Sequence, residues 1–464
     1  MNTKNHKIRI MIYMIVGVII AAVGVFLVLH SNNSQSSISL QDKLDLGHKY
    51  LVELSYDKAV LEFTDAIEID PMNADAYLGL ADAYIGQGDT DKAVEVLEKG
   101  FDKTGDERIK EKLDELKPSE VSSTMATTAV SLDNEITETE KKVTIKGQQY
   151  LTSLTELNLS ELELTDEDII PLSEFKNLVK LNLSNNYITD VSVLLCLENL
   201  AELDWSNNEL TDISSLAGLK NLRKLNLSCN FINDISPLKG LTNLTYLNLS
   251  YCNCLDYTHL IDISPLSSLT KLTYLDLSEI FINNINALSD LTNLIYLNLE
   301  LCSGFDIQLN DISPLSKLTN LQNLNLCDNQ ISDISVLSSL TNLTDLSLYN
   351  NQISDISALS GLTSLTYLNL WSNQIQDITS LGGLTSLIEL DLSNNNISDI
   401  DPLSKLTNLT KLELGGNQFN DISSLSGLSN LDYVVLDYNP ISDISLDNLK
   451  QQLPNSKIYW EPDF

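Results

Sequence analysis

One spacing of apolar and polar residues dominates the C-terminal two-thirds of the chain. The pattern L-x-x-L-x-L-x-x-N-x-I/L recurs, and nine of the twelve intervals between successive first leucines are 22 residues, the others being 24, 28 and 27. Such a repeat predicts stacked units that share one parallel sheet. Thirteen units are expected, with first leucines at residues 154, 178, 200, 222, 244, 272, 294, 321, 343, 365, 387, 409 and 431.

Each unit is predicted to begin with a short strand. Because alternate residues of a strand point to opposite faces, Leu247 and Leu249 are expected in the core, with Tyr246, Asn248 and Ser250 facing out. The Asn after each strand is expected to be buried, with its amide bonded to backbone groups of its own unit and the next. These asparagines are Asn186, Asn208, Asn230, Asn329, Asn351, Asn373, Asn395, Asn417 and Asn439.

The return half of each unit reads D-I-S-x-L. Its Ser or Thr, such as Ser214 or Ser236, is expected to be the N-cap of a short 3₁₀ turn, with Pro237 at the first helical position. The recurring Asp is explained better by local turn bonding than by calcium. A hairpin at 143–151 is expected to cover the first unit, and a helix at 446–453 followed by a strand at 458–460 the last.

These units resemble the bacterial internalin-type leucine-rich repeat (LRR) family. The most similar single unit is Asn342 to Gly361, NLTDLSLYNNQISDISALSG. The resemblance implies an α/β solenoid, with the parallel sheet on the concave face and short helical turns on the convex side. It also leaves open a calcium site near the first unit, where Asp166, Glu167 and Asp168 cluster.

The N-terminal region contains a candidate membrane anchor. Residues Ile10 to Leu29 form a run of 20 residues without a charge, and a helix of that length covers about 30 Å, one bilayer core. Lys4, Lys7 and Arg9 precede the run. The next cation is Lys43, so the N-terminus is expected in the cytoplasm and the later domains outside the cell. A cleaved signal peptide is the alternative, but its apolar region is usually about 7–15 residues.

Residues 44–116 have a helical period with small residues at close-packing positions. The pairs Ala59/Ala93 and Ala66/Gly100 are separated by 34 residues, and they resemble those of tetratricopeptide (TPR) repeats. Such repeats bind a peptide or protein partner in a groove. The alternative reading is a spacer that lifts the next domain off the membrane. About three repeats are normally needed for independent stability.

Composition narrows the function further. With 28 Lys and Arg against 64 Asp and Glu, the net charge of −36 argues against nucleic acid as a partner and against charge-driven adhesion to anionic lipid. The four histidines (His6, His30, His48 and His259) have no metal-ligand spacing. No nucleophile or phosphate-binding motif is found in the sequence. We therefore expect no enzyme, no cofactor and no metal.

The six cysteines lie at 196, 229, 252, 254, 302 and 327. Cys252 and Cys302 replace Asn in the ladder two units apart, about 9–10 Å by strand spacing. A disulfide spans at most about 7 Å between Cα atoms. Buried free thiols are therefore expected.

Aromatic residues point to a binding surface. Three successive strands place Tyr246, Tyr274 and Tyr296 in one outward column, and the first and third of these units carry insertions of six and five residues, whereas Trp205 occupies a core position. Outward aromatics anchor protein or glycan partners, although cross-strand stacking alone is the alternative. The candidate ligand-binding residues are Tyr246, Tyr274, Tyr296, Tyr257, His259, Phe305, Tyr349, Tyr367 and Trp371.

The sequence thus predicts an α/β LRR solenoid, preceded by an all-α TPR-like domain and one transmembrane helix. The expected parts are a cytoplasmic tail at 1–9, the transmembrane helix at 10–29, TPR-like repeats at 40–116, a Ser/Thr-rich linker at 117–142 and the LRR domain at 143–464. The expected function is non-enzymatic recognition of a protein or glycan outside the cell. The alternatives are an envelope scaffold that organises membrane proteins through its TPR repeats, and an intracellular phosphatase-regulatory LRR protein.

Overall fold

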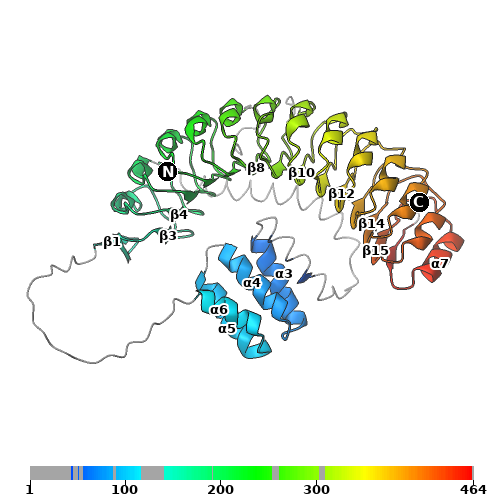
Figure 1. The fold of residues 1–464 in the computed structure, drawn as a ribbon, viewed down its shortest axis with the longest axis horizontal. Coiled ribbons are helices and arrows are strands. Elements are labelled where there is room, and N and C mark those ends of the chain that lie inside the picture. The colour runs from blue at the N-terminus through cyan, green and yellow to red at the C-terminus, as the bar shows by residue number, and fades with distance from the viewer. Residues whose placement is uncertain are drawn as a thin grey trace, which may run out of the picture. The chain divides into compact units, whose positions relative to one another are not determined.

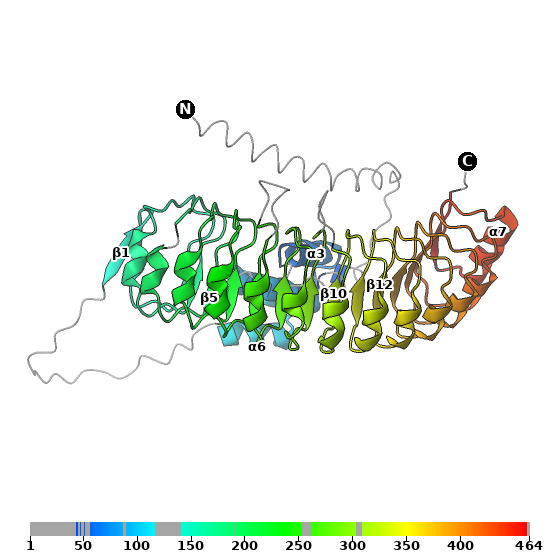
Figure 2. The same ribbon diagram turned by 90° about the horizontal axis from the view of Figure 1, so that it is seen from above.

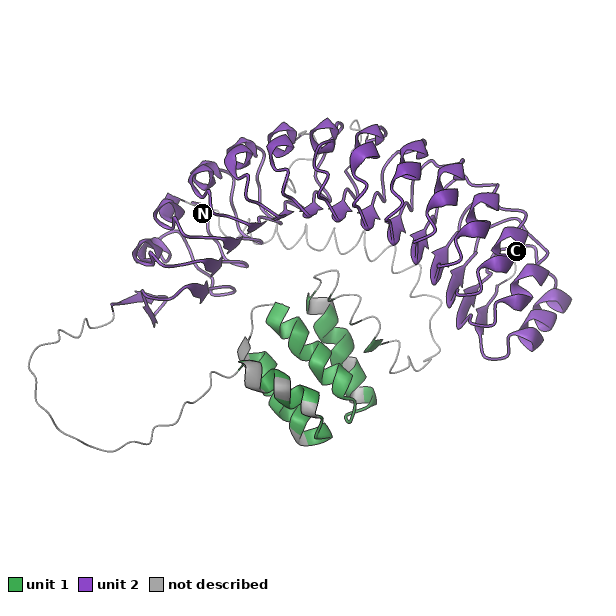
Figure 3. Ribbon diagram, in the orientation of Figure 1, with its two compact units in different colours: residues 1–134 green, residues 135–464 purple. Residues whose placement is uncertain are grey.

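The computed structural model describes residues 43–44, 47, 51, 56–86, 90–116, 141–190, 192–252, 261–302 and 309–461. The chain divides into two compact units, residues 1–134 and 135–464 (Figure 3). The expected anchor Ile10–Leu29 and residues 117–140 of the expected linker lie outside the described residues. Among the helices that are described, none has the length and apolar character needed to cross a bilayer.

Within the described part of the first unit, four helices follow one another from Tyr56 onward: α3 (Tyr56–Ile69), α4 (Ala74–Gly86), α5 (Thr90–Thr104) and α6 (Glu107–Leu116). Asn73 begins α4, because its Oδ1 accepts a hydrogen bond from the Ala76 N–H at 2.9 Å. The expected close approach is present at Gly100, where an added Cβ would lie 2.7 Å from Cγ of the Tyr77 ring. Ala59, Ala66 and Ala93 are fully buried.

The second unit is built around one 14-stranded sheet in which each strand pairs in parallel with the next along the chain. The first thirteen strands are the thirteen predicted units. Their bounds are β3 (Glu156–Asn158), β4 (Lys180–Asn182), β5 (Glu202–Asp204), β6 (Lys224–Asn226), β7 (Tyr246–Asn248), β8 (Tyr274–Asp276), β9 (Tyr296–Asn298), β10 (Asn323–Asn325), β11 (Asp345–Ser347), β12 (Tyr367–Asn369), β13 (Glu389–Asp391), β14 (Lys411–Glu413), β15 (Tyr433–Val435) and, beyond the repeats, β16 (Lys457–Tyr459).

Short 3₁₀ helices form the return side of the second unit. Figure 1 shows them on the outer, convex side of the arc that this unit makes, with the strands on the inner, concave side, and Figure 2 shows them in one row. They are η1 (Ile170–Glu174), η2 (Ser192–Cys196), η3 (Ser214–Gly218), η4 (Ser236–Gly240), η5 (Ser264–Ser268), η6 (Asn286–Leu288), η7 (Ser313–Lys317), η8 (Ser335–Ser339), η9 (Ser357–Gly361), η10 (Thr379–Gly383), η11 (Asp401–Lys405) and η12 (Ser423–Gly427).

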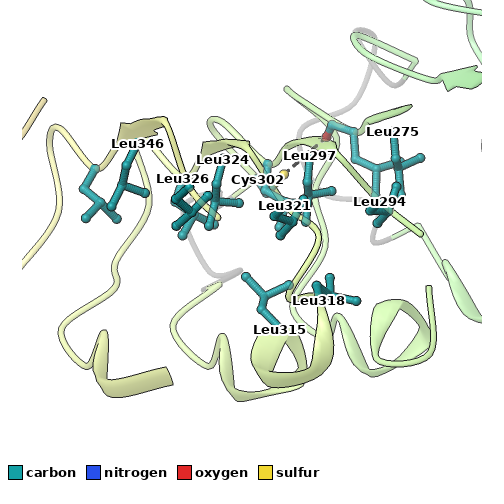
Figure 4. Packing of buried hydrophobic residues seen from close by; sticks show 14 of the residues in the cluster. Leu275, Leu294, Leu297, Cys302, Leu315, Leu318, Leu321, Leu324, Leu326 and Leu346 are labelled. Carbon is teal, nitrogen blue, oxygen red and sulfur yellow. Dashed lines mark hydrogen bonds between the residues drawn. The ribbon is translucent and has the colours of Figure 1, made fainter. Parts of the chain in front are cut away.

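A continuous leucine core fills the space between the strands and the 3₁₀ helices (Figure 4). In one unit, Leu315 and Leu318 come from the return side and Leu324 and Leu326 from the strand, and all four are buried. Each buried leucine stabilises the fold by about 1.5–3 kcal/mol relative to an exposed one. Because one unit cannot cover this core alone, neighbouring units stabilise one another.

The asparagine ladder binds backbone groups of two units. Nδ2 of Asn186 donates to the carbonyl oxygens of Leu183 in its own unit and Leu159 in the preceding one, both at 2.9 Å. Its Oδ1 accepts from the Leu164 N–H, also at 2.9 Å. The predicted burial is confirmed, but the partner unit was wrong, since it is the preceding one. Asn185 has a left-handed backbone conformation (φ 58°) and turns the chain. After this turn, the side-chain amide of Asn186 faces the preceding unit.

Cysteine substitutes for asparagine at two ladder positions. Sγ of Cys252 donates to the Leu227 carbonyl, and Sγ of Cys302 to that of Leu277, both at 3.2 Å. The thiol thus keeps one of the hydrogen bonds of the amide. All five described cysteines are free, and the expected burial holds for Cys252, Cys302 and Cys327, whereas Cys196 is exposed and Cys229 is half-buried. Burial raises the pKa of the Cys302 thiol.

Aspartate, and not serine, accepts the first N–H of most of the 3₁₀ helices. Oδ1 of Asp212 accepts a hydrogen bond of 2.8 Å from the Ser214 N–H. Ser214 is the first residue of η3, Ile213 occupies the N-cap position, and no side-chain cap bond is formed there. The prediction of a serine N-cap was therefore wrong, because the helix starts at the serine itself. The predicted local turn bonding of the Asp column is confirmed.

Both ends of the sheet are covered as expected. Strands β1 (Lys142–Ile145) and β2 (Gln148–Leu151) form an antiparallel hairpin before the first unit. At the other end, α7 (Asp443–Gln452) precedes β16, which pairs with β15. The α7 N-terminus is capped by Ser442, whose hydroxyl accepts from the Ser445 N–H. The hairpin is a separate two-stranded sheet, whereas β16 is the last strand of the large sheet.

Candidate functional site on the concave face

The parallel register places equivalent residues of successive units side by side on the concave face. Tyr246 pairs with Tyr274, and Tyr274 with Tyr296, while the leucines that follow them point into the core. The first two rings stack with centroids 4.2 Å apart and planes at 12°, and the second and third with 4.3 Å and 6°. We call these three residues the aromatic strip. The expected outward column is therefore confirmed as one continuous stack.

The rings of the aromatic strip are half-buried, because they cover one another. This burial raises the pKa values of Tyr246 and Tyr274, and the carboxylate of Asp276 adds to both shifts. Each stacked pair contributes about 0.5–1.5 kcal/mol beyond the burial of its surface. The stack therefore stiffens β7 to β9, while part of each side chain stays exposed on the concave face.

The third outward residue of most units is less exposed than expected. Ser250 and Ser393 are buried, with exposed fractions of 7% and 8%, so the expectation that Ser250 faces solvent was wrong. The N–H of each donates to the side chain two residues before it, Asn248 for Ser250 and Asp391 for Ser393, both at 2.9 Å. This turn ends the strand and draws the small side chain in.

A second aromatic group lies farther along the sheet, in this third column. The rings of Tyr349 and Trp371 are 5.9 Å apart and inclined at 51°, and Trp371 is 39% exposed. Tyr367 instead occupies the column of the aromatic strip, where it pairs with Asp345 and not with another aromatic residue. The structure therefore divides the predicted aromatic residues into the strip, the Tyr349–Trp371 pair and Tyr367.

Glu300 connects the strand of Tyr296 to the second aromatic group. Its Oε1 accepts a hydrogen bond of 2.8 Å from the Tyr349 hydroxyl, and its Oε2 accepts one of 2.9 Å from Nδ2 of Asn325. Burial, and after it the charge of Glu300, raise the pKa of Tyr349. The carboxylate is thus held in one position across three strands.

Two further carboxylates lie beside the aromatic strip. Asp276 has an exposed fraction of 8%, and its burial raises its pKa although the Ser278 N–H donates to it. Burial also raises the pKa of Glu279, and the nearby charge of Glu300 adds to this effect, while a hydrogen bond from Tyr251 opposes it. Burial is the main cause of both shifts.

The centre of the concave face contains no basic residue at all. Neither Lys, Arg nor His occurs in the segments 246–251, 274–279, 296–301, 323–328, 345–350, 367–372 and 389–394, which cover β7 to β13 and the three residues after each. These central segments hold seven carboxylates: Asp276, Glu279, Glu300, Asp328, Asp345, Glu389 and Asp391. On β4 to β6 the charges alternate instead, and Lys180 and Lys224 pair with Glu156 at 3.3 Å and Glu202 at 3.5 Å.

The remaining predicted residues are not among the described residues of the concave surface, and two carboxylates on it were not predicted. Tyr257, His259 and Phe305 lie outside the described residues. Trp205 is fully buried, as expected. Glu300 and Glu279 were missed by sequence reasoning, although a signal was present: each departs from the usual residue of its column, which is mostly Ser for Glu300 and often Asn for Glu279.

The acidic cluster near the first unit is hydrogen-bonded to backbone groups of its own unit and of the next. Oδ1 of Asp166 accepts from the N–H groups of Thr189 at 2.8 Å and Asp190 at 3.0 Å. Oδ2 of Asp168 accepts from the Thr165 N–H at 3.0 Å and pairs with Lys146 at 3.3 Å. Within the described part of the chain, no group of His, Cys, Asp and Glu is arranged to hold a metal ion.

Comparison with protein families supports both halves of this description. A model of leucine-rich repeats, two copies at a time, matches residues 176–218, 198–240, 220–260, 319–361, 341–383, 363–405, 385–430 and 407–451. A tetratricopeptide repeat model matches residues 55–114. The ranges of the first model leave out 261–318, where Ile280 and the second insertion break the repeat. No curated protein matches the chain.

Among solved structures, an internalin (InlF) from Listeria monocytogenes is 35% identical with a TM-score of 0.61. The match covers 68% of this chain and 90% of the internalin chain. The chain belongs to the internalin-type leucine-rich repeat family. An LRR protein of Leptospira interrogans is 29% identical with a TM-score of 0.53, and the match covers 68% of this chain and 91% of that one.

A more distant structure shares the fold alone. The LRR ectodomain of the plant membrane receptor kinase GASSHO1/SCHENGEN3 from Arabidopsis thaliana, in complex with CASPARIAN STRIP INTEGRITY FACTOR 2, is 22% identical with a TM-score of 0.52. The match covers 67% of this chain and 42% of that one. Internalin-type LRR proteins are protein-recognition modules, and aromatic residues of the kind found on this concave face are enriched where proteins bind.

Proposed function

We propose that this internalin-type chain is a membrane-anchored cell-surface recognition protein that binds a protein partner through its concave face. The aromatic strip is the observation that carries the proposal. Three tyrosines stacked at 4.2 and 4.3 Å form a rigid surface. Because their ring positions are already fixed, little side-chain entropy is lost when a partner covers them. Tyrosine is also among the residues that contribute most to binding energy at interfaces.

Charge indicates the kind of protein partner. The seven carboxylates of the central segments have no Lys, Arg or His among them, so a partner that brings basic side chains relieves their repulsion. A complementary charge also accelerates association, and that acceleration falls as salt rises. We therefore expect the association rate to decrease with ionic strength while the dissociation rate changes little.

The proposed role is non-enzymatic. The concave face offers aromatic rings, carboxylates that are hydrogen-bonded in place, and buried serines, which suit contact better than catalysis. Glu300 is held by Tyr349 and Asn325, and Asp276 by Ser278. We expect no turnover and no cofactor requirement.

The location rests on the sequence alone. The 20-residue apolar run Ile10–Leu29 and the three cations before it support a single-pass anchor with residues 31–464 outside the cell. Protease added to intact cells should then degrade the LRR unit, and the chain should stay in the membrane fraction at high salt. Full protection of the LRR unit in cells whose wall admits the protease would refute this topology.

Binding is tested by comparing the full chain with two tyrosine variants on an array of proteins and glycans. Tyr274→Ala removes the middle ring of the strip. Tyr187→Ala is the matched control, because Tyr187 is 45% exposed and belongs to a different unit. We expect a protein signal that Tyr274→Ala weakens by at least about thirtyfold, the equivalent of about 2 kcal/mol, and that Tyr187→Ala leaves unchanged. A signal on glycans alone, or equal loss in both variants, would contradict the proposal.

The helical unit has a separate proposed role. Residues 55–114 match tetratricopeptide repeats, which also occur as partner-binding modules, so an envelope scaffold is the second candidate function. We favour a spacer, because about three repeats are normally needed for independent stability. Deletion of residues 40–116 should leave recognition by the LRR unit intact. Loss of association with other membrane proteins in that variant would favour the scaffold.

A further inference from the structure

A cavity of about 430 Å³ opens at the N-terminal ends of strands β4 to β7. Its wall is made by the residue immediately before each of these strands, by asparagines two residues earlier in three units, and by Lys271. A volume of this size fits a small ligand or one terminal group of a larger one. The cavity lies beside the aromatic strip, because the N–H groups of Thr245 and Tyr246 both donate to the Arg223 carbonyl oxygen, at 2.8 and 3.1 Å.

The charge of this cavity is opposite to that of the chain. Its only charged lining residues are Arg223 and Lys271, and no carboxylate lines it, in a protein of net charge −36. Arg223 is also the only arginine in residues 135–464. Neither side chain forms an ion pair with a described residue, whereas the neighbouring Lys224 pairs with Glu202 at 3.5 Å. Two cations are thus left uncompensated at one place.

Hydrogen bonds hold part of the cavity wall in position. Nζ of Lys271 donates to Oδ1 of Asn243 at 2.7 Å, and Nδ2 of Asn243 donates to the Lys220 carbonyl oxygen at 3.0 Å. Nδ2 of Asn221 donates in the same way to the Glu198 carbonyl oxygen at 2.8 Å. Oδ1 of Asn243 already accepts from Lys271, whereas Oδ1 of Asn221 and of Asn199 accepts no hydrogen bond from a described residue, so these two oxygens are the acceptors offered to a ligand. The cavity therefore combines fixed positive charge with hydrogen-bond acceptors.

We propose that this cavity is a binding site for an anionic group, a carboxylate or a phosphate monoester, carried on a ligand with hydroxyl groups. The guanidinium group of Arg223 presents paired N–H donors that match the two oxygens of either anion, and Lys271 adds a second positive charge. The asparagine oxygens accept hydrogen bonds from the hydroxyls. A ligand bound here extends onto Tyr246, whereas the carboxylates of Asp276 and Glu300 beyond the strip repel a second anionic group.

The site goes beyond the proposed function, because it is testable with small anions whether or not the partner is a protein. We would titrate the full chain, in detergent, with glucuronate and with glucose 6-phosphate at low chloride concentration and follow the heat of binding. Glucose is the uncharged comparison. We expect saturable binding of at least one of the two anions and none of glucose. The tighter of the two shows whether the ligand group is a carboxylate or a phosphate.

Two variants distinguish a built site from general attraction to positive charge. Arg223→Gln removes the guanidinium group from an exposed position, so the fold is expected to stay intact. Lys224→Gln removes one positive charge from the adjacent residue, outside the cavity wall. We expect at least a tenfold weaker affinity in Arg223→Gln and less than a twofold change in Lys224→Gln. Equal weakening in both variants, or no saturable binding of either anion to the unaltered chain, would overturn the proposal.

Discussion

The hydroxyl group of Tyr349 donates a hydrogen bond of 2.8 Å to Oε1 of Glu300, although 49 residues separate them in the sequence. The bond joins the units of β9 and β11 across the intervening strand β10. Together with the hydrogen bond from Nδ2 of Asn325, it orients the carboxylate on the concave face. It also brings the Tyr349–Trp371 pair into one network with the strand of Tyr296.

Removal of this bond tests its contribution to stability. Tyr349→Phe should lower the free energy of unfolding by about 1–2 kcal/mol, because a hydrogen bond to a charged acceptor is lost while the ring stays packed. Thermal unfolding measures the effect. Tyr187→Phe is the control, since this exposed tyrosine should change stability by less than about 0.5 kcal/mol. Equal midpoints for the two variants would show that Glu300 is satisfied equally well by water.

The asparagine ladder predicts that two substitutions at Asn373 lower the stability by different amounts. Nδ2 of Asn373 donates to the Leu348 carbonyl at 3.0 Å, and its Oδ1 accepts from the Ile353 N–H at 3.0 Å. Asn373→Ala leaves the Ile353 N–H buried without a partner, which should cost about 1–3 kcal/mol. The Leu348 carbonyl oxygen keeps its hydrogen bond of 3.1 Å from Nδ2 of Asn351. Asn373→Cys should fall between this variant and the unaltered chain, because a thiol keeps one bond, as Cys302 does.

The adjacent Gln374 is the matched control for the ladder. Its side chain is exposed, so Gln374→Ala should be nearly neutral in the same denaturant titration. If Asn373→Cys proved as destabilising as Asn373→Ala, the thiol–carbonyl contact would contribute nothing to stability.

The environment of Asp391 predicts that its contribution to the free energy of unfolding falls as pH rises. Burial and the neighbouring Glu413 raise the pKa of Asp391 to about 6. The folded state therefore binds this proton more tightly than the unfolded state, so the contribution is present below pH about 4 and is lost as pH rises through 6. Asp391→Asn should stabilise the protein at pH 7.5 by about 1–2 kcal/mol and change little at pH 4.

Other units of this chain already carry Asn at the position equivalent to Asp391. Asn248 and Asn369 occupy the same column as Asp391, and Asn can accept the Ser393 N–H with its own Oδ1. Exposed Asp432→Asn is the control. A gain in stability at pH 4 equal to that at pH 7.5 would rule out the proposed titration of Asp391.

The capping aspartates predict the opposite dependence on pH. Hydrogen bonds from the Ser335 N–H and hydroxyl lower the pKa of Asp333, and similar bonds act at Asp234 and Asp355. A lowered pKa gives stability that is present above pH about 4 and is lost as pH falls through the folded-state value. Asp333→Asn should keep the cap, as Asn284 does for Asn286, and should reduce the acid sensitivity.

The test of this cap needs a second variant. Asp333→Ala removes the acceptor and should lower the unfolding midpoint at every pH, whereas Asp333→Asn should lower it little at pH 7. Both are measured by thermal unfolding between pH 3 and pH 7. Identical midpoints at pH 7 would mean that the Ser335 N–H loses nothing without its carboxylate.

The sequence by itself determined the repeat, the strand positions and the inward leucines, because a period of 22 residues gives each unit the same pattern of side-chain alternation. Parallel pairing then follows, since equivalent residues bury the same face. For that reason the column of Tyr246, Tyr274 and Tyr296 was predictable. The helix start at Ser214 was not, because Asp212 and Ser214 can each accept from an N–H two or three residues further on, and only the backbone decides which one does.

Only the tertiary structure decided which side chains meet across units. Glu300 reaches Tyr349 two strands away, and Asn186 turns to the preceding unit and not to the next. Arg223 and Lys271, 48 positions apart, line one cavity. The physical reason is that the repeat fixes where each Cα lies, whereas the direction of a long side chain depends on its rotamer and on which neighbour offers a partner. Contacts between side chains of different units therefore cannot be predicted from the sequence pattern of a single unit.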